Sequence, residues 1–272
     1  MTFEQFAESF GLIMRGVQPG KWVAVPTVDH PHKRNGRYKY MGDRGWVQNW
    51  ATMLAPQMWT GQCSNAEEFR HLAAKSDADR KFAAERAARK AGWILHQCVQ
   101  ETHPYLERKG FPKERGNVWT IDGTRLLVIP MRIGSRLVGV QFIDHEGEKR
   151  FLHGQTTKGA SFTFDAGGLP IFVEGFATGL SVRAAMQAVK LRYKIHVCFS
   201  AGNLEHVARS VERGFVVADN DPHDAGLVAA RNSRHPYWIS PTVGEDFNDF
   251  HLRVGLFQAA KALKHTLLPS FE

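Results

Sequence analysis

Four acidic side chains in the C-terminal half follow short apolar segments and have the chemistry of a metal site. Ile171-Phe172-Val173 runs into Glu174, Phe215–Ala218 runs into Asp219-Asn220-Asp221, and a later stretch reaches Asp246. Carboxylates gathered in one place repel one another, and a hard, oxygen-seeking dication is the usual compensation. We therefore predict a Mg²⁺ site, which Mn²⁺ would also fit. Its ligands would be Glu174, Asp219, Asp221 and Asp246, the first three also being the catalytic acids.

The spacing within Asp219-Asn220-Asp221 strengthens this prediction. Side chains alternate in direction along an extended strand, so residues i and i+2 point to the same side. Both aspartates can then face one metal ion. A plainer interpretation exists for each motif, because Asp-Asn-Asp-Pro is favourable turn chemistry and Glu174-Gly175 can simply end a strand. The occurrence of acids at three segment ends together favours the metal site.

The elements that must position these acids alternate between strands and helices. Residues 166–272 contain apolar runs at 170–173, 195–199, 214–218 and 237–239, with helical stretches at 178–190, at 203–213 and after Asp224. Strands separated by helices of this length indicate a parallel sheet. Ligands bind at the carboxyl edge of such a sheet, where the acids lie. The fold class expected for this part is therefore α/β.

The preceding residues differ in pattern. Residues 65–165 begin with an Ala-, Glu-, Lys- and Arg-rich stretch that predicts one or two helices. Short β-rich runs separated by glycine turns follow, which indicates an antiparallel meander and a mixed α+β subdomain. Residues 1–64 are rich in aromatic residues and turn signals, so we expect a small β-rich region there. We place the second boundary at about residues 165–168.

Composition and charge narrow the class of protein. With 272 residues and 43% hydrophobic content the chain can bury a substantial core. No apolar run approaches the roughly 20 residues that span a bilayer, and the N-terminus lacks a signal-peptide pattern, so we expect a cytoplasmic protein. The net charge is +8, of which +7 lies in residues 1–165 and +1 in residues 166–272. A polyanionic partner for the basic part is the implied interpretation.

The three cysteines, Cys63, Cys98 and Cys198, are scattered with no CxxC pair. Neither a disulfide framework nor a zinc ribbon is indicated. A zinc site that combines Cys63 with a nearby histidine would match no common ligand spacing. We therefore expect reduced thiols and no zinc.

The acidic motifs resemble the TOPRIM domain shared by bacterial-type primases, topoisomerases and certain nucleases. The matching residues are Glu174-Gly175 and Asp219-x-Asp221, with Gly226 downstream. The stretch 244–249 resembles the Lys-Asp-x-Asn-Asp/Glu motif of phage-type primases, in which the first Asp is metal-associated. That match falls on Asp246, whereas Glu245 stands where a Lys is common. The resemblance implies a C-terminal TOPRIM domain preceded by a basic primase subdomain.

The segments before the acids narrow the resemblance to plasmid and phage primases. They are His103–Gly110, Leu127–Arg132, Val138–Ile143 and Gly147–Leu152, with Ser200–Leu204 also typical of the group. The resemblance implies nucleotide contacts from basic residues in this part, namely Arg125, Arg132, Lys149 and Lys158. A weaker similarity covers residues 33–50, which would occupy the template-binding position without zinc. Stacking and phosphate contacts there would use Arg37, Tyr38, Lys39, Trp46 and Trp50, although these aromatic residues could equally form a small core.

The function implied is that of a DNA primase, a Mg²⁺-dependent DNA-directed RNA polymerase. It would make short RNA primers on single-stranded DNA from ribonucleoside triphosphates, for phage or plasmid replication. No GxxxxGK[ST] loop is present, so we expect a separate helicase partner. The alternatives are a TOPRIM-type metal-dependent nuclease and a non-catalytic, single-stranded-DNA-binding replication accessory.

Overall fold

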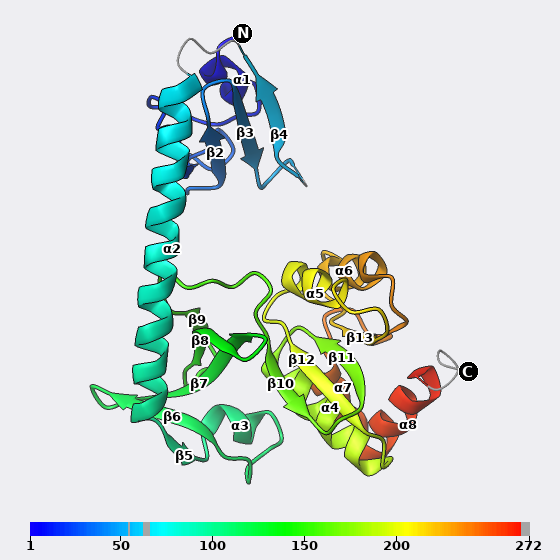
Figure 1. The fold of residues 1–272 in the computed structure, drawn as a ribbon. Helices are drawn as coiled ribbons and strands as arrows, with labels where there is room; N and C mark the ends of the chain where they lie inside the picture. The colour runs from blue at the N-terminus through cyan, green and yellow to red at the C-terminus, as the bar shows by residue number, and fades with distance from the viewer. Residues whose placement is uncertain (54, 62–65, 268–272) are drawn as a thin grey trace. The chain divides into compact units, whose positions relative to one another are not determined.

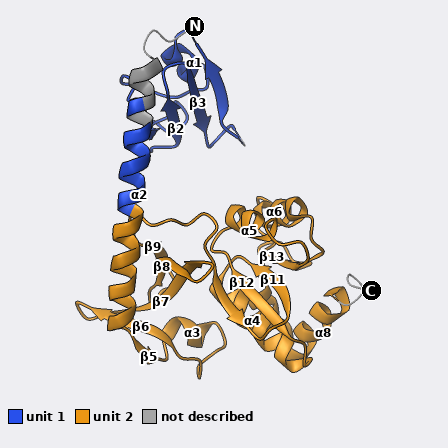
Figure 2. Cartoon of the chain, in the orientation of Figure 1, with its two compact units in different colours: residues 1–83 blue, residues 84–272 orange. Residues whose placement is uncertain are grey.

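The computed structural model describes residues 1–53, 55–61 and 66–267. The chain divides into two compact units, residues 1–83 and 84–272 (Figure 2). The division falls within the long helix α2 (Ala66–Gln97), which begins in the first unit and ends in the second (Figure 1). Cys63 and the helix start expected at 64–65 lie outside the described residues.

The first unit is built on a four-stranded antiparallel sheet in the order β1-β2-β3-β4. Its strands are β1 (Trp22–Val25), β2 (Gly36–Tyr40), β3 (Arg44–Asn49) and β4 (Gln57–Thr60). Helix α1 (Phe3–Ser9), which begins with a capping box between Thr2 and Gln5, packs Phe3 against one face of the sheet. The expected β-rich region is confirmed, and α1 is an addition to it.

The second unit contains two five-stranded sheets. The antiparallel sheet has the order β5-β6-β7-β8-β9, which confirms the expected meander. Its strands are β5 (Val99–Glu101), β6 (Gly116–Ile121), β7 (Thr124–Ile133), β8 (Arg136–Ile143) and β9 (Lys149–Phe151), and helix α3 (Pro104–Arg108) lies between β5 and β6. Ala87, Ala91 and Ile94 of α2 pack on one face of this sheet.

The second sheet has the order β10-β12-β11-β13-β14, in which β11 to β14 are parallel and β10 is antiparallel. The strands are β10 (Phe162–Asp165), β11 (Leu169–Val173), β12 (Tyr193–Val197), β13 (Phe215–Ala218) and β14 (Tyr237–Ile239). The helices are α4 (Phe176–Ala188), α5 (Ala201–Ala208), α6 (Ala225–Ser233), α7 (Phe247–Val254) and α8 (Leu256–Leu267). The parallel α/β arrangement expected from the sequence is confirmed.

Alternation along the strands explains how helices cover both faces of this sheet. Ile171 and Val173 of β11 share a core with α4, α7 and α8, whereas Phe172 between them packs with α5 and α6. The first of these cores also contains Leu127 and Ile143 of the antiparallel sheet, so the two sheets are joined within one unit. The boundary expected near 165–168 therefore lies inside this unit, and β10, which precedes it, pairs with β12.

Candidate active site

Three of the four predicted acids line one cavity at the carboxyl edge of the parallel sheet. Strands β11 and β13 are neighbours, and the chain leaves them directly at Glu174 and Asp219. Asp246 reaches the same place from the N-cap of α7. All three side chains line a cavity of about 360 Å³. The topology thus brings together acids that are far apart in the sequence.

Asp219 is the most perturbed of these acids. Burial raises its pKa to about 8, and the nearby charges of Asp246 and Glu174 act in the same direction, while Lys149 opposes them. Its Oδ1 atom is buried and has no hydrogen-bond partner among the described residues. A buried carboxylate oxygen without a partner is costly, so it is a position where a cation would be stabilising.

Glu174 and Asp246 complete the acidic side of the cavity. Burial raises the pKa of Glu174, the ammonium of Lys149 opposes this shift, and the charges of Asp221 and Asp246 add to it. The Oδ1 atom of Asp246 accepts a hydrogen bond from the backbone N–H of Asp249 at 2.8 Å, which caps α7. The effects of Asp221 and Asp246 on the pKa of Glu174 are the mutual repulsions that the sequence predicted for carboxylates gathered in one place.

Asp221 does not line the cavity in the way that the i, i+2 spacing predicted. Strand β13 ends at Ala218, so the alternation that the prediction used has stopped before Asp221 is reached. Its carboxylate instead accepts backbone N–H groups from His223, Ala225 and Gly226 at 2.9 to 3.2 Å. Partial burial works to raise the pKa of Asp221, but these hydrogen bonds outweigh it and lower the pKa. The turn interpretation of this residue therefore applies, although its charge still acts on Asp219 and Glu174.

Gly226 makes this arrangement possible. A Cβ atom at this position would stand 2.1 Å from the backbone oxygen of Asp219. Only glycine therefore lets the first turn of α6 approach the end of β13 this closely. The glycine following the Asp-x-Asp motif has a packing reason, independent of any resemblance.

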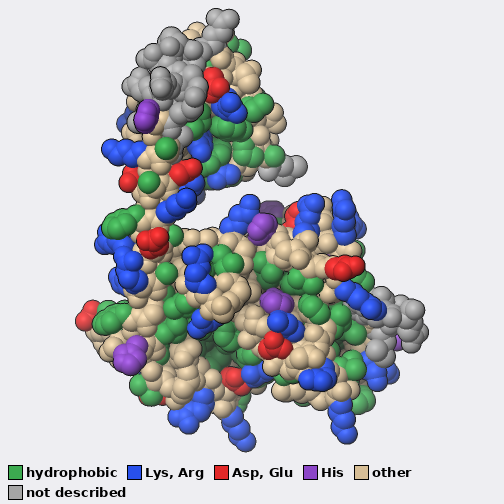
Figure 3. All heavy atoms as spheres, in the orientation of Figure 1, with side chains coloured by type: hydrophobic (Ala, Val, Ile, Leu, Met, Phe, Trp, Pro, Cys, Tyr) green, Lys and Arg blue, Asp and Glu red, His purple; other side chains and the backbone are tan. Residues whose placement is uncertain are grey.

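Basic side chains and a further acid, Glu146, also line the cavity. The basic ones are Lys149 of β9 and Arg108 and Lys109 at the end of α3. The sequence analysis assigned no role to these last two. Lys109 also forms an ion pair with Asp249 at 3.3 Å. On the face of this unit that Figure 3 shows, Lys and Arg side chains are more widespread than Asp and Glu.

The other three basic residues predicted to contact nucleotides do not line the cavity. Arg125 pairs with Glu101 at 2.8 Å and donates to the Thr102 carbonyl. Arg132 donates to the carbonyl of Ser135 at 2.8 Å. Lys158 is exposed on the loop before β10. Lys149 is therefore the predicted basic residue that the structure places beside the acids.

The cavity also contains the N-terminus of α4. Gly175 is its N-cap, and no side chain in the described part of the chain caps it. Gly175, Ala177 and Thr178 line the cavity, so the positive end of the helix dipole faces it. The Nζ atom of Lys149 lies 3.8 Å from where a Cβ of Gly175 would stand, which adds positive charge at this point.

The donor set fits a hard dication. Glu174, Asp219 and Asp246 supply carboxylate oxygens, the ligands that Mg²⁺ prefers, and the unpartnered Oδ1 of Asp219 is available to one. Over residues 1–53, 55–61 and 66–267, no three His, Cys, Asp or Glu side chains stand as a closed metal-binding group. The acids therefore surround the cavity without meeting one another.

The residues predicted to contact the template lie in the first unit, on both faces of its sheet. Tyr38 is 1% exposed in the core and its hydroxyl bonds the backbone of Gly16 and Gln18, so its ring is not available for stacking. Arg37 lies on the other face, over the rings of Trp22 at 4.5 Å and Trp50 at 5.6 Å. Trp22 was not among the predicted residues.

The same outer face carries a row of side chains in register across the four strands. The row is formed by Trp22, Lys39, Trp46 and Met58. Trp22, Trp50 and Met58 are among the exposed large hydrophobic residues of the chain. An exposed face of aromatic and basic side chains has the composition of a stacking surface for single strands.

Solved structures similar to this chain include two that contain a bacteriophage T7 primase. No family model matches the chain, and no curated protein matches it. The first structure is a bacteriophage T7 lagging-strand DNA polymerase interacting with primase domains of two gp4 subunits bound to an RNA/DNA hybrid and dTTP. Its TM-score is 0.43 at 15% identity, over 60% of this chain and 84% of that chain. The second is the primase fragment of the bacteriophage T7 primase-helicase protein, with a TM-score of 0.41 at 15% identity, over 60% of this chain and 69% of that chain. Both TM-scores are below 0.5. No helix in the described part of the chain is both long and apolar enough to cross a membrane.

Proposed function

We propose that this chain is a DNA primase that makes short RNA primers on single-stranded DNA with Mg²⁺. One observation carries the proposal: a single cavity is lined both by the acids Glu174, Asp219 and Asp246, with Glu146, and by the cations Arg108, Lys109 and Lys149. Acids suit metal ions, and a cluster of cations suits the phosphates of a nucleoside triphosphate. A site for metal-assisted transfer between nucleotides needs both kinds of group at once.

The chain's own residues would divide the work of nucleotide transfer. Glu174, Asp219 and Asp246 would hold Mg²⁺. With the ion bound there, charge on the attacking and leaving oxygens of an in-line displacement would be neutralised. Lys149 and the N-terminus of α4 would hold the triphosphate. Glu174 would either complete this metal site or, if it is not a ligand, accept a proton from the attacking 3′-hydroxyl.

We further propose that the template contacts the outer face of the first unit's sheet. Arg37, Lys39 and Arg44 are the charged residues of its four strands, which contain no acid. A phosphate backbone is attracted to such a face, while Trp22 and Trp50 offer rings on which bases stack. Compared with the sequence-based set, this surface gains Trp22 and loses Tyr38. A separate helicase would deliver the single-stranded template.

Two other functions fit some of the same features. A TOPRIM-type nuclease would use the acids to cut DNA with Mg²⁺ and would need no nucleoside triphosphate. A non-catalytic accessory would bind single strands through the first unit alone. The cations that line the cavity beside the acids favour phosphate chemistry over the accessory, and the resemblance of the segments before the acids to plasmid and phage primases favours synthesis over cleavage.

The test is incubation of the full chain with single-stranded DNA of varied sequence, labelled ribonucleoside triphosphates and Mg²⁺. Asp219→Asn should abolish product. Asp165→Asn, which neutralises an exposed carboxylate paired with Lys194 in the same sheet, should leave it unchanged. Shortening of the DNA without added nucleotides would favour the nuclease. Absence of product from the wild type on every template and with Mn²⁺ as well would overturn the proposal.

A further inference from the structure

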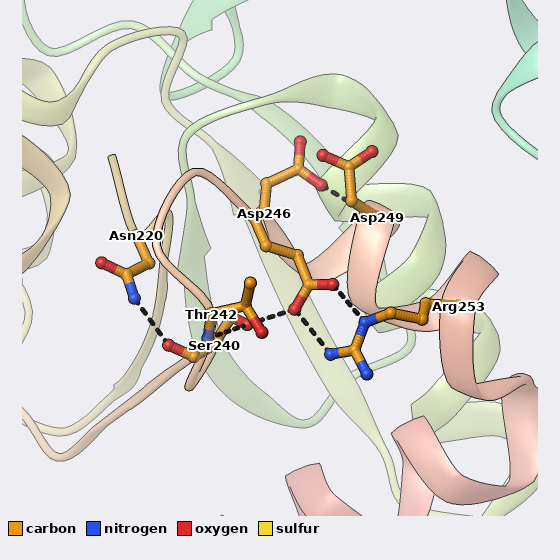
Figure 4. Close-up of polar contacts among 7 residues, drawn as sticks. Asn220, Ser240, Thr242, Asp246, Asp249 and Arg253 are labelled. Atoms are coloured by element: carbon orange, nitrogen blue, oxygen red, sulfur yellow. Dashed lines mark hydrogen bonds and ion pairs between the residues drawn. The ribbon is translucent and has the colours of Figure 1, made fainter. Parts of the chain in front are cut away.

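The loop between β14 and α7 carries Asp246 to the cavity, and hydrogen bonds hold it along its length (Figure 4). Ser240 Oγ accepts from the N–H of Thr242 at 3.1 Å and donates to the carboxylate of Glu245. The N–H of Glu245 donates to the Thr242 carbonyl at 3.3 Å. The loop is thereby closed on itself immediately before Asp246.

Glu245 is the centre of this network. Its carboxylate accepts two hydrogen bonds from Arg253, from Nε at 2.7 Å and from an Nη at 2.9 Å. Glu245 is 8% exposed and Arg253 lies in the last turn of α7, with its guanidinium 5.3 Å from the ring of Phe250. Two-point pairing of this kind fixes direction as well as distance. The ion pair therefore connects Glu245, the residue before Asp246, to the C-terminal end of α7, the helix that Asp246 caps.

The same loop is attached to the strand end that carries Asp219. Asn220 donates from its side chain to the Ser240 carbonyl at 2.8 Å and from its backbone to the Glu245 carbonyl at 3.3 Å. Its own carbonyl accepts from the N–H of Gly244. The chain neighbours of Asp219 and Asp246, namely Asn220 and Glu245, are thus bonded to each other.

We infer that Glu245 and Arg253 are positioning residues that hold Asp246 beside Asp219 against their mutual repulsion. The two carboxylates repel each other, and each would gain from moving apart when no cation lies between them. The series of hydrogen bonds from Arg253 through Glu245 to Asn220 resists that movement. The inference rests on the proposed function for the metal site, but its test does not require polymerase activity.

Arg253→Gln is the informative substitution because three explanations of the ion pair predict three different effects on Mg²⁺ affinity. Loss of positioning weakens Mg²⁺ binding, by about tenfold if the effect equals that of removing an outer-shell partner. Simple electrostatics predicts tighter binding, since a nearby positive charge is removed. A purely stabilising pair predicts a lower melting temperature with unchanged Mg²⁺ affinity. Arg253 does not line the cavity, so the substitution leaves the cavity's own groups in place.

Arg183→Gln is the matched control. Arg183 also pairs with a single carboxylate, Glu114 at 2.6 Å, and also lies over a phenylalanine ring, Phe164 at 4.8 Å. It belongs to the same unit and lies outside the cavity lining. Loss of this pair should lower stability without changing the response to Mg²⁺.

The measurement is the Mg²⁺ dissociation constant, fitted from the logarithmic rise of the melting temperature with Mg²⁺ concentration, for wild type, Arg253→Gln, Arg253→Lys and Arg183→Gln. We expect a shift of about tenfold for Arg253→Gln, a smaller shift for Arg253→Lys, which keeps the charge, and none for Arg183→Gln. In primer synthesis, Arg253→Gln should raise the Mg²⁺ requirement and leave the KM for nucleotides at saturating Mg²⁺ unchanged. Equal Mg²⁺ dissociation constants for Arg253→Gln and Arg183→Gln, or tighter binding by Arg253→Gln, would overturn the inference. A wild type that binds Mg²⁺ but makes no primers would instead contradict the proposed function alone.

Discussion

Asp219→Asn should stabilise the metal-free protein while abolishing its activity, and the gain should depend on pH. Burial raises the pKa of Asp219 to about 8, from an ordinary value of 3.8. Between about pH 4 and about pH 8, the Asp219 carboxyl group is protonated in the folded chain and ionised in the unfolded chain. Folding stability therefore falls as pH rises from about 4 to about 8. An asparagine at this position does not titrate, so the folding stability of the variant does not fall in this way as pH rises.

The expected size follows from the same pKa. Each unit of pKa difference corresponds to about 1.4 kcal/mol. At pH 7 the unfolding free energy of the wild type is therefore lowered by up to about 4 kcal/mol, whereas that of the variant is not. Relaxation around the charged carboxylate reduces this, and we expect a gain of about 1 to 3 kcal/mol. Below pH 4 the carboxyl group is protonated in both states and the gain should vanish. Excess Mg²⁺ should raise the stability of the wild type more than that of Asp219→Asn.

Urea denaturation in EDTA at several pH values between 4 and 8 measures this difference in unfolding free energy. Asp165→Asn is the control of opposite sign. Hydrogen bonds from Gly167 and the Lys194 side chain lower the pKa of Asp165, so its ionised form is the stabilising one and its replacement should not stabilise at neutral pH. A difference between wild type and Asp219→Asn that stays constant from pH 4 to 8 would refute the assignment of Asp219 as a buried, unpartnered carboxylate.

Three further predictions concern the cavity, its backbone and the first unit's sheet. Lys149→Ala should raise the KM for nucleotides about tenfold, as expected for a lost charged contact of about 1.5 kcal/mol, whereas Lys158→Ala, outside the cavity lining, should change it less in the same steady-state assay. Gly226→Ala should lower the unfolding free energy by about 1 to 3 kcal/mol in urea, because its Cβ would meet backbone at 2.1 Å; an unchanged midpoint would contradict this contact. Trp22→Ala should weaken binding of labelled single-stranded DNA by roughly 5- to 150-fold in fluorescence anisotropy, since one stacked base contributes about 1 to 3 kcal/mol. Tyr38→Phe should lower stability and leave DNA binding unchanged, and the opposite pattern for these two variants would show that the outer face is not the binding surface.

The sequence predicted the parallel sheet and the convergence of acids because both depend on local pattern and on chain order. Glu174 and Asp219 follow buried strands directly, and neighbouring parallel strands present their carboxyl ends at one edge. Asp221 lies outside the cavity lining, unlike Asp219, because strand β13 ends at Ala218 and the alternation expected along it does not continue. Where a strand stops is decided by the turn that follows, here the hydrogen bonds from the start of α6 to Asp221.

Arg108 and Lys109 could not have been assigned from pattern alone. They are the last residue and the C-cap of α3, more than 60 residues before Glu174 along the chain, and only the packing of the two sheets into one core brings them to the cavity. The burial of Tyr38, by contrast, had a signal in the sequence. Arg37, Tyr38 and Lys39 alternate along β2, so a face that exposes the two basic residues must turn the tyrosine inward.

The most direct test of the central claim is the retention of a labelled γ-phosphate in the product. A primase begins a chain from two nucleoside triphosphates, so RNA oligonucleotides made on single-stranded DNA should keep the γ-phosphate of the first nucleotide and incorporate the α-phosphate of later ones. The wild type with Mg²⁺ is predicted to give products that carry both labels, and Asp219→Asn none. Products that lack the γ-label, or equal synthesis by Asp219→Asn, would contradict the assignment of this cavity as a primer-synthesising centre.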